Sequence, residues 1–183
     1  MNGRLHHPAG SLAIEGHEVL LTPETAGWSY SGLQVLSLSP RVERSTFLDD
    51  CEAVVLPISA VDVTVTIDGE TFVLQGRTSP FARVSDFVYA PLGATITVVA
   101  DGGGDVAIAT ARCERRLTAR YGAAEDVQID VFGAGPATRQ LPTYALYGET
   151  HPYQRVDALH CESIAERSRL HDWEIRPHRH ESM

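Results

Sequence analysis

The clearest pattern along the chain is an alternation of apolar and polar residues over positions 61–67. Valine or isoleucine occupies the odd positions, and aspartate or threonine the even ones, so one face of an extended segment can be buried while the other meets water. Asp68 and Gly69 follow at once, and Asp-Gly is a strong signal for a two-residue hairpin turn, because both central residues of that turn need a positive φ. We therefore predict a strand over 61–67, a turn at 68–69 and a returning strand over 71–74.

Other segments rich in β-branched and aromatic residues are also predicted to be strands, separated by turns that contain glycine, proline or aspartate. They cover residues 32–38, 53–56, 87–90, 94–100, 106–111 and 156–164. Helical periodicity is scarce, and residues 114–121 fit either a brief helix or a solvated connector. Many short strands at close spacing are typical of an all-β sandwich or barrel.

The composition is that of an ordinary globular protein. The chain has 183 residues, 43% of them hydrophobic and 21% charged, which suits one large domain or one domain plus a fragment. Its formal net charge of −9 argues against nucleic acid as a partner, because such binding relies on lysine and arginine displacing counterions. No run is long enough to cross a bilayer, and residues 1–16 lack the apolar stretch of a signal peptide. We therefore expect a cytoplasmic protein with no membrane or nucleic-acid partner.

The cysteines add little to this picture. Cys51, Cys113 and Cys161 are odd in number and widely spaced. This spacing fits neither a disulfide framework nor a zinc ribbon. We expect idle thiols in a reducing compartment.

Residues 43–96 contain parts of a two-segment pattern, with Glu52 in the first segment and Pro-Leu-Gly at 91–93 in the second. The pattern resembles the two signatures of cupin barrels, in which His-x-His and Glu of the first and His of the second hold a divalent metal. The first signature's histidine positions fall within 45–48 and the second's falls at Ile96, and none of these residues is a histidine. Hydroxyl and aliphatic side chains are poor ligands for such a metal, so we expect this barrel to hold none.

A longer series of short motifs occurs in a fixed order between His17 and His180. The motifs are Thr22-Pro-Glu-Thr-Ala-Gly-Trp-Ser-Tyr-Ser-Gly32, Leu56-Pro57, Gly76-Arg-Thr-Ser-Pro-Phe81, Asp86, Tyr89, Pro91, Gly133-Ala-Gly135 and Thr138-Arg-Gln140. This order resembles the N-terminal half of the 5-deoxy-glucuronate isomerase family, whose members carry two cupin barrels. The resemblance implies a mobile lead-in over 1–16 and a complete cupin barrel (a jelly roll or double-stranded β-helix) without metal ligands over 17–135. A linker and the first strands of a second, truncated barrel would then occupy 136–183.

The segment from Trp173 to Glu181 resembles the opening of the second barrel in that family, where the metal site lies. Its Pro-His-Arg-His run puts His178 and His180 at the positions of the first two metal ligands. Two imidazoles at i and i+2 of a strand share one face and can hold one ion together. The sequence ends at Met183, before the family's third ligand, a glutamate, and its fourth, a histidine. The resemblance therefore implies a divalent metal cofactor of the zinc or manganese type, with an incomplete ligand set in this chain.

The activity that the resemblance implies is an aldose–ketose isomerisation in bacterial myo-inositol catabolism. A small sugar acid, 5-deoxy-glucuronate, would become 5-dehydro-2-deoxy-gluconate as a proton moves between adjacent carbons through an enediol. Arg139 is the candidate substrate-binding residue, because arginine can bind a carboxylate through two parallel hydrogen bonds. No residue of the chain can be assigned as the catalytic base.

Simpler interpretations stand beside these. Arg139 and Arg77 also fit surface arginines near turns. Trp28 and Tyr30 could line a sugar pocket, although aromatic residues more often anchor a core.

Two further functions remain open, and both are non-catalytic. The chain could be a cupin module that acts in assembly or in sugar-acid binding, or a small-ligand sensor with an aromatic-lined pocket in the first barrel. The strands missing from the second barrel would leave unpaired sheet edges, which invite pairing with another chain. We therefore expect a homo-oligomer or a complex with a separately encoded second half.

Overall fold

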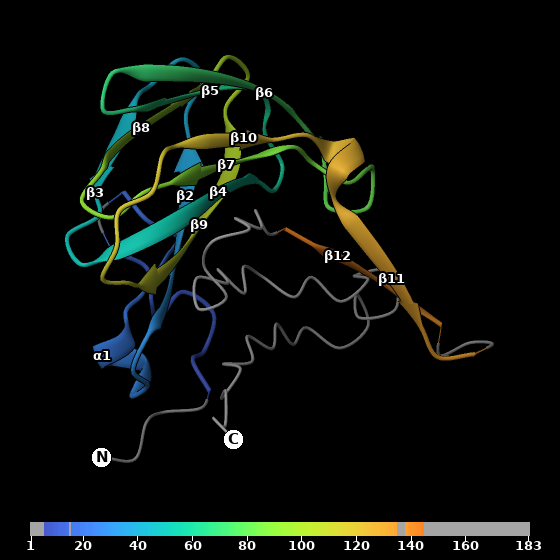
Figure 1. The fold of residues 1–183 in the computed structure, drawn as a ribbon, viewed down its shortest axis with the longest axis horizontal. Helices are drawn as coiled ribbons and strands as arrows, with labels where there is room; N and C mark the ends of the chain where they lie inside the picture. The colour runs from blue at the N-terminus through green and yellow to red at the C-terminus, as the bar shows by residue number, and fades with distance from the viewer. Residues whose placement is uncertain (1–5, 15, 135–137, 145–183) are drawn as a thin grey trace.

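The computed structural model describes residues 6–14, 16–134 and 138–144, and nearly all the regular structure in these ranges is β-strand (Figure 1). The exceptions there are a short helix, α1 (Pro23–Ala26), and a 3₁₀ turn, η1 (Ala124–Asp126). The strands are β1 (Val19–Leu21), β2 (Ser31–Leu38), β3 (Arg44–Phe47), β4 (Cys51–Pro57), β5 (Val61–Ile67), β6 (Glu70–Gly76), β7 (Phe87–Ala90), β8 (Thr95–Ala100), β9 (Gly104–Arg112), β10 (Arg120–Gly122), β11 (Gln128–Phe132) and β12 (Arg139–Thr143). The prediction of an all-β chain is confirmed. Neither helix in the described ranges has the length and apolar character needed to span a membrane.

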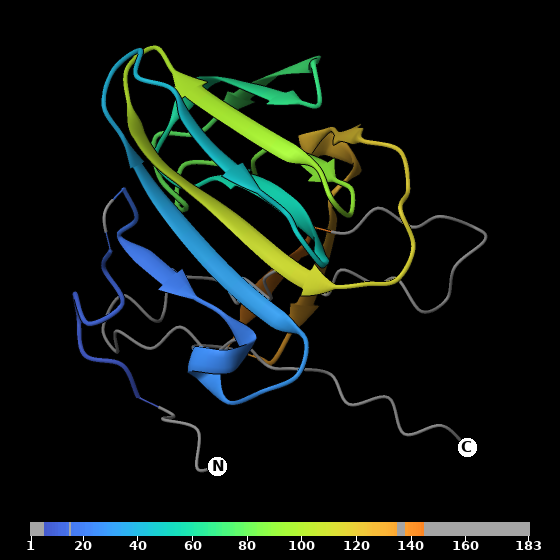
Figure 2. The same ribbon diagram turned by 90° about the vertical axis from the view of Figure 1, so that its left-hand side faces the viewer.

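Two antiparallel sheets face one another and enclose the main core (Figure 2). The six-stranded sheet has the order β1-β2-β9-β4-β7-β10, and the four-stranded sheet has the order β3-β8-β5-β6. The longest pairing joins β2 to β9, from Ser31 opposite Ala111 to Leu38 opposite Gly104. Strands distant in sequence thus lie side by side in two layers, which is typical of a jelly-roll barrel.

The hairpin predicted from the alternating pattern is confirmed. β5 pairs with β6 in register, and Thr66 lies opposite Thr71. Asp68 and Gly69 form the turn with φ values of 49° and 91°, as a two-residue turn of this type requires. The odd-numbered residues of β5 face the core from Val63 to Ile67, where they are at most 2% exposed.

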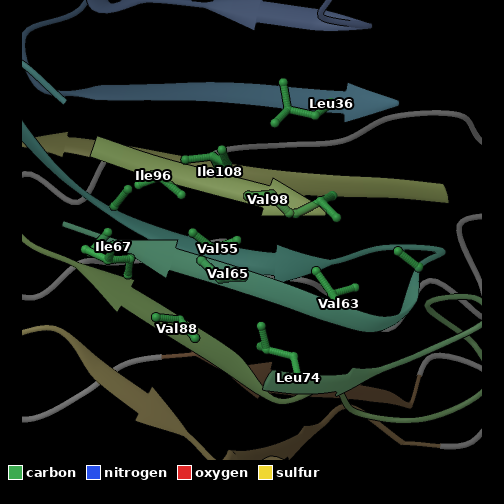
Figure 3. Close-up of a cluster of buried hydrophobic side chains, with 14 of the residues drawn as sticks. Leu36, Val55, Val63, Val65, Ile67, Leu74, Val88, Ile96, Val98 and Ile108 are labelled. Carbon is green, nitrogen blue, oxygen red and sulfur yellow. The ribbon is translucent and has the colours of Figure 1, made fainter. Parts of the chain in front are cut away.

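Aliphatic side chains from both sheets fill the interior between them (Figure 3). They include Leu36, Val55, Val88 and Ile108 from the six-stranded sheet and Val63, Val65, Ile67, Leu74, Ile96 and Val98 from the four-stranded sheet. Burying one such side chain contributes roughly 1.5–3 kcal/mol, so this interior is the main source of stability.

Strand β4 is buried on both faces, which explains its unbroken apolar run. Ala53 and Val55 point into the core between the sheets. Val54 and Leu56 point to the opposite face, where they meet a second cluster of buried residues. That cluster also contains Phe87, Tyr89, Val127 and Tyr144. The outer face of the six-stranded sheet is therefore partly covered by later segments of the chain.

Residues 113–119 form a connector, which is one of the two structures that the sequence left open for this stretch. Arg116 binds Asp68 Oδ2 at 2.6 Å there, and Leu117 packs against the second cluster. Several other elements differ from the sequence predictions. The strands β1, β3 and β10–β12 were missed, since they are short or mostly exposed and lack a continuous apolar pattern. The helix α1 was missed as well, although Thr22 and Thr25 form a capping box around Pro23.

The hairpin of β11 and β12 extends away from the two main sheets (Figure 1). Tyr144 directly after it is fully buried and makes an edge-to-face contact with Phe87. The predicted boundary between the first barrel and the linker falls between these two strands, at residues outside the described ranges. That division into parts stays a prediction, as does the strand at 156–164, which also lies outside the described residues.

Candidate functional site

The barrel interior offers no ligands at the positions where a cupin would hold its metal. Ile96, at the second signature's histidine position, and Leu48, within the first signature's range, are fully buried in the aliphatic core. Aliphatic side chains have no lone pairs to donate to a cation. Across the described residues, no group of three or more His, Cys, Asp or Glu side chains could hold a metal ion.

Glu52, at the position of the cupin carboxylate, points away from this interior. It shares a strand face with Val54 and Leu56 on the outer side of the six-stranded sheet. The Tyr89 hydroxyl donates a hydrogen bond of 2.6 Å to Glu52 Oε2. Burial of this carboxyl, which is 2% exposed, raises its pKa above the ordinary value. This hydrogen bond links β4 to β7, and the carboxyl lies almost entirely out of contact with solvent.

The Glu52→Gln variant is expected to gain stability relative to the wild type as the pH rises. Because the pKa of Glu52 is higher in the folded than in the unfolded state, the wild type loses stability from about pH 4.5 upwards, until the folded-state pKa is passed. Glutamine has the same shape, still accepts the Tyr89 hydrogen bond and does not titrate. Urea unfolding of both proteins between pH 4 and 8 measures the difference. A difference that is the same at every pH would contradict the raised pKa.

Two thiols occur in this region: Cys113 interacts with the Glu52 carboxyl, and Cys51, the residue before Glu52, packs against the main core. Burial raises the pKa of each thiol to about 11. Both are free cysteines, and at neutral pH both remain protonated and weakly nucleophilic. This agrees with their interpretation as idle thiols, while Cys161 lies outside the described residues.

Arg77 is buried, so its interpretation as a surface arginine is wrong. Only 5% of the residue is exposed. Its Nε donates to the Pro57 carbonyl at 2.9 Å, and its Nη1 donates to the Arg83 carbonyl and to Tyr144 Oη, each at 3.4 Å. Within the described part of the chain, no carboxylate forms an ion pair with this guanidinium. The side chain therefore joins β4, the β6–β7 connection and the residue after β12.

Asp86 anchors the other side of the same connection. Its carboxylate accepts hydrogen bonds from the backbone N–H groups of Gln75 at 2.8 Å and Gly76 at 2.9 Å. The hydroxyls of Ser85 and Tyr121 donate to it at 3.3 Å and 3.0 Å. The Gly76–Asp86 stretch, which carries the strongest sequence motif, is thus a structural frame. Sequence reasoning missed this role because the three partners other than Ser85 lie at least ten residues away from Asp86 along the chain.

A smaller polar group lies on the inner side of the six-stranded sheet. Gln34 shares a strand face with Leu36 and lies 3.3 Å, Oε1 to Nε2, from His17. The Thr46 hydroxyl donates to Gln34 Oε1 at 3.1 Å. These groups are bonded to one another and present hydrogen-bonding side chains beside an otherwise aliphatic interior.

The two aromatic residues of the N-terminal motif are not part of either buried cluster. Trp28 is half-buried, and its indole N–H donates to the Ser31 carbonyl. Tyr30 is 68% exposed, so its interpretation as a core anchor is wrong.

Of the three predicted site residues, only the backbone of Arg139 falls within the described part of the chain. Arg139 opens β12, where its backbone pairs with Phe132. His178 and His180 lie outside the described residues. Their roles in substrate and metal binding stay predictions.

Comparison with solved structures supports the all-β cupin fold of this chain. An IolB-like protein from Salmonella typhimurium aligns with a TM-score of 0.65 at 23% identity over 72% of this chain and 50% of its own. A putative glyoxylate-induced protein from Pseudomonas aeruginosa aligns with a TM-score of 0.50 at 13% identity over 72% of this chain and 48% of its own. A cupin protein from Bacteroides fragilis gives a TM-score of 0.41 at 16% identity over 62% of this chain and 86% of its own.

The sequence also matches the model of the KduI/IolB family over residues 6–182, and the chain belongs to this family. The family predicted from the order of motifs is therefore confirmed. The chain spans about half the length of the first two solved structures named above. A search of curated proteins finds no match to the sequence.

Proposed function

We propose that the protein functions in a cytoplasmic sugar isomerase that converts 5-deoxy-glucuronate to 5-dehydro-2-deoxy-gluconate in myo-inositol catabolism. One observation carries the proposal: the KduI/IolB family match extends over residues 6–182 and so includes the His178-Arg-His180 run. In this proposal the described barrel has a structural role, and the residues that bind the metal and the substrate lie in the segment that follows it.

The reaction moves hydrogen within one molecule, so no atom or electron is gained or lost. A proton leaves the hydroxyl-bearing carbon next to the aldehyde, and a proton is delivered to the former carbonyl carbon, with an enediol between the two steps. The aldehyde becomes a primary alcohol and the neighbouring hydroxyl becomes a ketone. A divalent metal, when bound, would stabilise negative charge that develops on the carbonyl oxygen.

The residues that would bind the metal and the substrate come from the C-terminal part of the chain. His178 and His180 would be two of the metal ligands, since imidazole suits zinc- and manganese-type cations. Arg139 would hold the substrate carboxylate through two parallel hydrogen bonds. The main core of the first barrel supports this division, because its buried residues are aliphatic and carry neither metal-binding nor charged groups.

The first test is the metal content of the purified, tag-free chain. We expect about one divalent ion per chain, lost in the His178→Ala/His180→Ala double variant, because removing both imidazoles removes the proposed site. The His160→Ala/His171→Ala variant is a matched control that removes two histidines without ligand spacing, and it should keep the ion. Equal metal content in both double variants would contradict the assignment.

The second test is turnover of 5-deoxy-glucuronate, followed by the appearance of the ketone in NMR spectra. In a chain that binds metal and is active, Arg139→Ala should raise KM at least tenfold, because the substrate carboxylate loses a charged partner. An unchanged KM would remove Arg139 from the substrate site.

A non-catalytic cupin module is the second candidate function. The observation in its favour is the barrel interior itself, which is filled by aliphatic side chains between the two sheets. A chain that contains no metal and shows no turnover would make this candidate the leading one.

A further inference from the structure

The β11–β12 hairpin forms an arm that is anchored to the barrel at its base. Val127, just before β11, and Tyr144, just after β12, are both buried in the cluster on the outer face of the six-stranded sheet. Gln128 lies opposite Thr143, so these two anchors flank the open end of the hairpin. From there the two strands extend away from both main sheets, and within the described ranges they pair with one another alone (Figure 1). The arm therefore has a fixed base and a projecting body.

Large apolar side chains are exposed along the arm. Ile129, Val131 and Phe132 on β11 are 47%, 62% and 55% exposed, whereas no other strand of the described ranges carries more than one exposed large hydrophobic residue. Ile129 and Val131 point to the same side, and Pro142 lies opposite Ile129 on that side. We call these three residues, Ile129, Val131 and Pro142, the apolar face of the arm. A two-stranded hairpin is marginally stable in water without further strands or packing, so this face is expected to be covered.

The area of the arm favours a covering segment from the same chain over a separate molecule. Strands of five residues that rise about 3.3 Å per residue and lie about 4.8 Å apart give a face of roughly 17 by 10 Å. A stable contact between separate proteins buries about 800 Å² on each partner, which is several times larger. The net charge of −9 further opposes a second copy. A tethered segment needs no such area, because its effective concentration beside the arm is on the order of millimolar.

The chain continues directly from the base of the arm. Residues 145–183 follow Tyr144, whose burial fixes the place where this segment starts. Within the segment, residues 156–164 are predicted to be a strand, with aliphatic residues at both ends and in the middle. Residues 145–155 can span at most about 36 Å when extended, which is about twice the length of the arm. The predicted strand can therefore reach every part of the arm.

We propose that residues 156–164 pack against the apolar face of the arm and cover Ile129 and Val131. The arm and the segment after Tyr144 then form one unit. In this arrangement the boundary between the two parts of the chain lies before β11 instead of after residue 135. The packing itself does not depend on the proposed function, because it requires neither metal nor substrate.

The arrangement also bears on where the candidate site residues lie. The backbone of Arg139 pairs with Phe132 at the tip of the arm. The segment that packs against the arm leads on to His178 and His180. The arm would thus hold Arg139 and this segment in one unit, whether or not the three residues act as proposed.

The first test measures whether the apolar face is covered in the full chain. Val131→Cys probes the face and Val73→Cys on β6 is the matched control, since the two valines are 62% and 68% exposed in the described part of the chain. Both variants also carry Cys161→Ser. Cys51 and Cys113 stay in place, because burial raises the pKa of both thiols to about 11 and both react slowly at neutral pH. We expect maleimide to label Val131→Cys about tenfold more slowly than Val73→Cys, or slower still, because the segment covers only the former.

The second test identifies the covering segment. With Cys161 retained, a short bis-maleimide should link it to the thiol of Ile129→Cys or Val131→Cys within one chain, because residues 156–164 lie beside both positions. Mass spectrometry of tryptic peptides, together with the mass of the linked protein, distinguishes this link from one between two chains. Val73→Cys should form no link to Cys161. Far-ultraviolet circular dichroism should show that each variant keeps the wild-type fold.

Three results would overturn the proposal. The first is equal labelling of Val131→Cys and Val73→Cys, which would leave the apolar face uncovered. The second is protection of Val131→Cys that disappears on dilution, since a second copy would then cover the face in place of the tethered segment. The third is the absence of a link within one chain between Cys161 and either position on the arm. None of these results bears on metal content or turnover, so this packing and the proposed function can fail independently.

Discussion

Replacing Gly76 by alanine is expected to lower the free energy of unfolding by about 3–5 kcal/mol. Gly76 has a φ of 66°, in the left-handed region that costs other residues about 1–2 kcal/mol. A Cβ atom here would also lie 2.2 Å from the Ala60 carbonyl oxygen, which is a backbone atom. That oxygen accepts a hydrogen bond from the Arg77 N–H at 2.9 Å, so moving it would disturb the same corner of the sheet.

The matched control for this variant is Gly69→Ala in the β5–β6 turn. Gly69 also has a positive φ, of 91°, but a Cβ atom there would meet nothing within 4 Å. Its cost should be that of the backbone alone, about 1–2 kcal/mol. Urea unfolding of both variants isolates the steric part as the difference. Equal losses of unfolding free energy in the two variants would show that the backbone at Ala60 can move aside without cost.

Replacing Arg77 by methionine is expected to cost about 2–4 kcal/mol. Methionine keeps most of the aliphatic stem but has no donor for the carbonyls of Pro57 and Arg83. Acceptors that stay buried without a partner cost about 1–3 kcal/mol each, and Tyr144 Oη would also lose its contact with the guanidinium. The Arg77→Lys variant should lose less stability than Arg77→Met, because the ammonium can still donate hydrogen bonds. It should not reach wild-type stability, because an ammonium has fewer donors than a guanidinium and they lie closer together.

Arg83→Met is the control for loss of an arginine from the same connection. Arg83 is exposed, and its side chain donates to Gln75 and to the Val84 carbonyl. Its loss should change the unfolding free energy by no more than about 0.5 kcal/mol. If Arg77→Met proves as stable as the wild type, the buried guanidinium contributes less than the apolar packing that replaces it.

The fold could be predicted from the sequence wherever a local pattern of apolar and polar residues shows which side chains are buried. The alternation over β5 and the Asp68-Gly69 turn encode their hairpin directly. The two-sided burial of β4 was not encoded in this way, because a continuous apolar run does not say which residues face which layer. Sequence reasoning thus assigned Glu52 to a cupin position without showing that it points out of the barrel.

The candidate site was less predictable, and for a physical reason. Gly76 and Arg77 stand out as a motif, but their partners Ala60, Pro57 and Tyr144 come from other strands or from the far end of the described chain. Only the folded structure distinguishes an arginine that ties segments together from one that binds substrate. The metal and substrate roles of His178, His180 and Arg139 came from the family resemblance, and they stay predictions.

The pairing of β2 with β9 has a consequence for how the chain folds during synthesis. Leu38 lies opposite Gly104, and β9 also pairs with β4. The strands β2 and β4 therefore cannot be joined in the six-stranded sheet until β9 has been synthesised. At about 5–20 residues per second, a ribosome needs several seconds to make the chain between these two residues. Contacts so distant in sequence also slow folding to milliseconds or seconds once the chain is complete. The edge of β2 that pairs with β9 must therefore remain unpaired for that interval, and the edge of the apolar strand β4 that pairs with β9 stays open until residues 104–112 have been made. The nascent chain is thus the state in which a chaperone would have the most surface to bind.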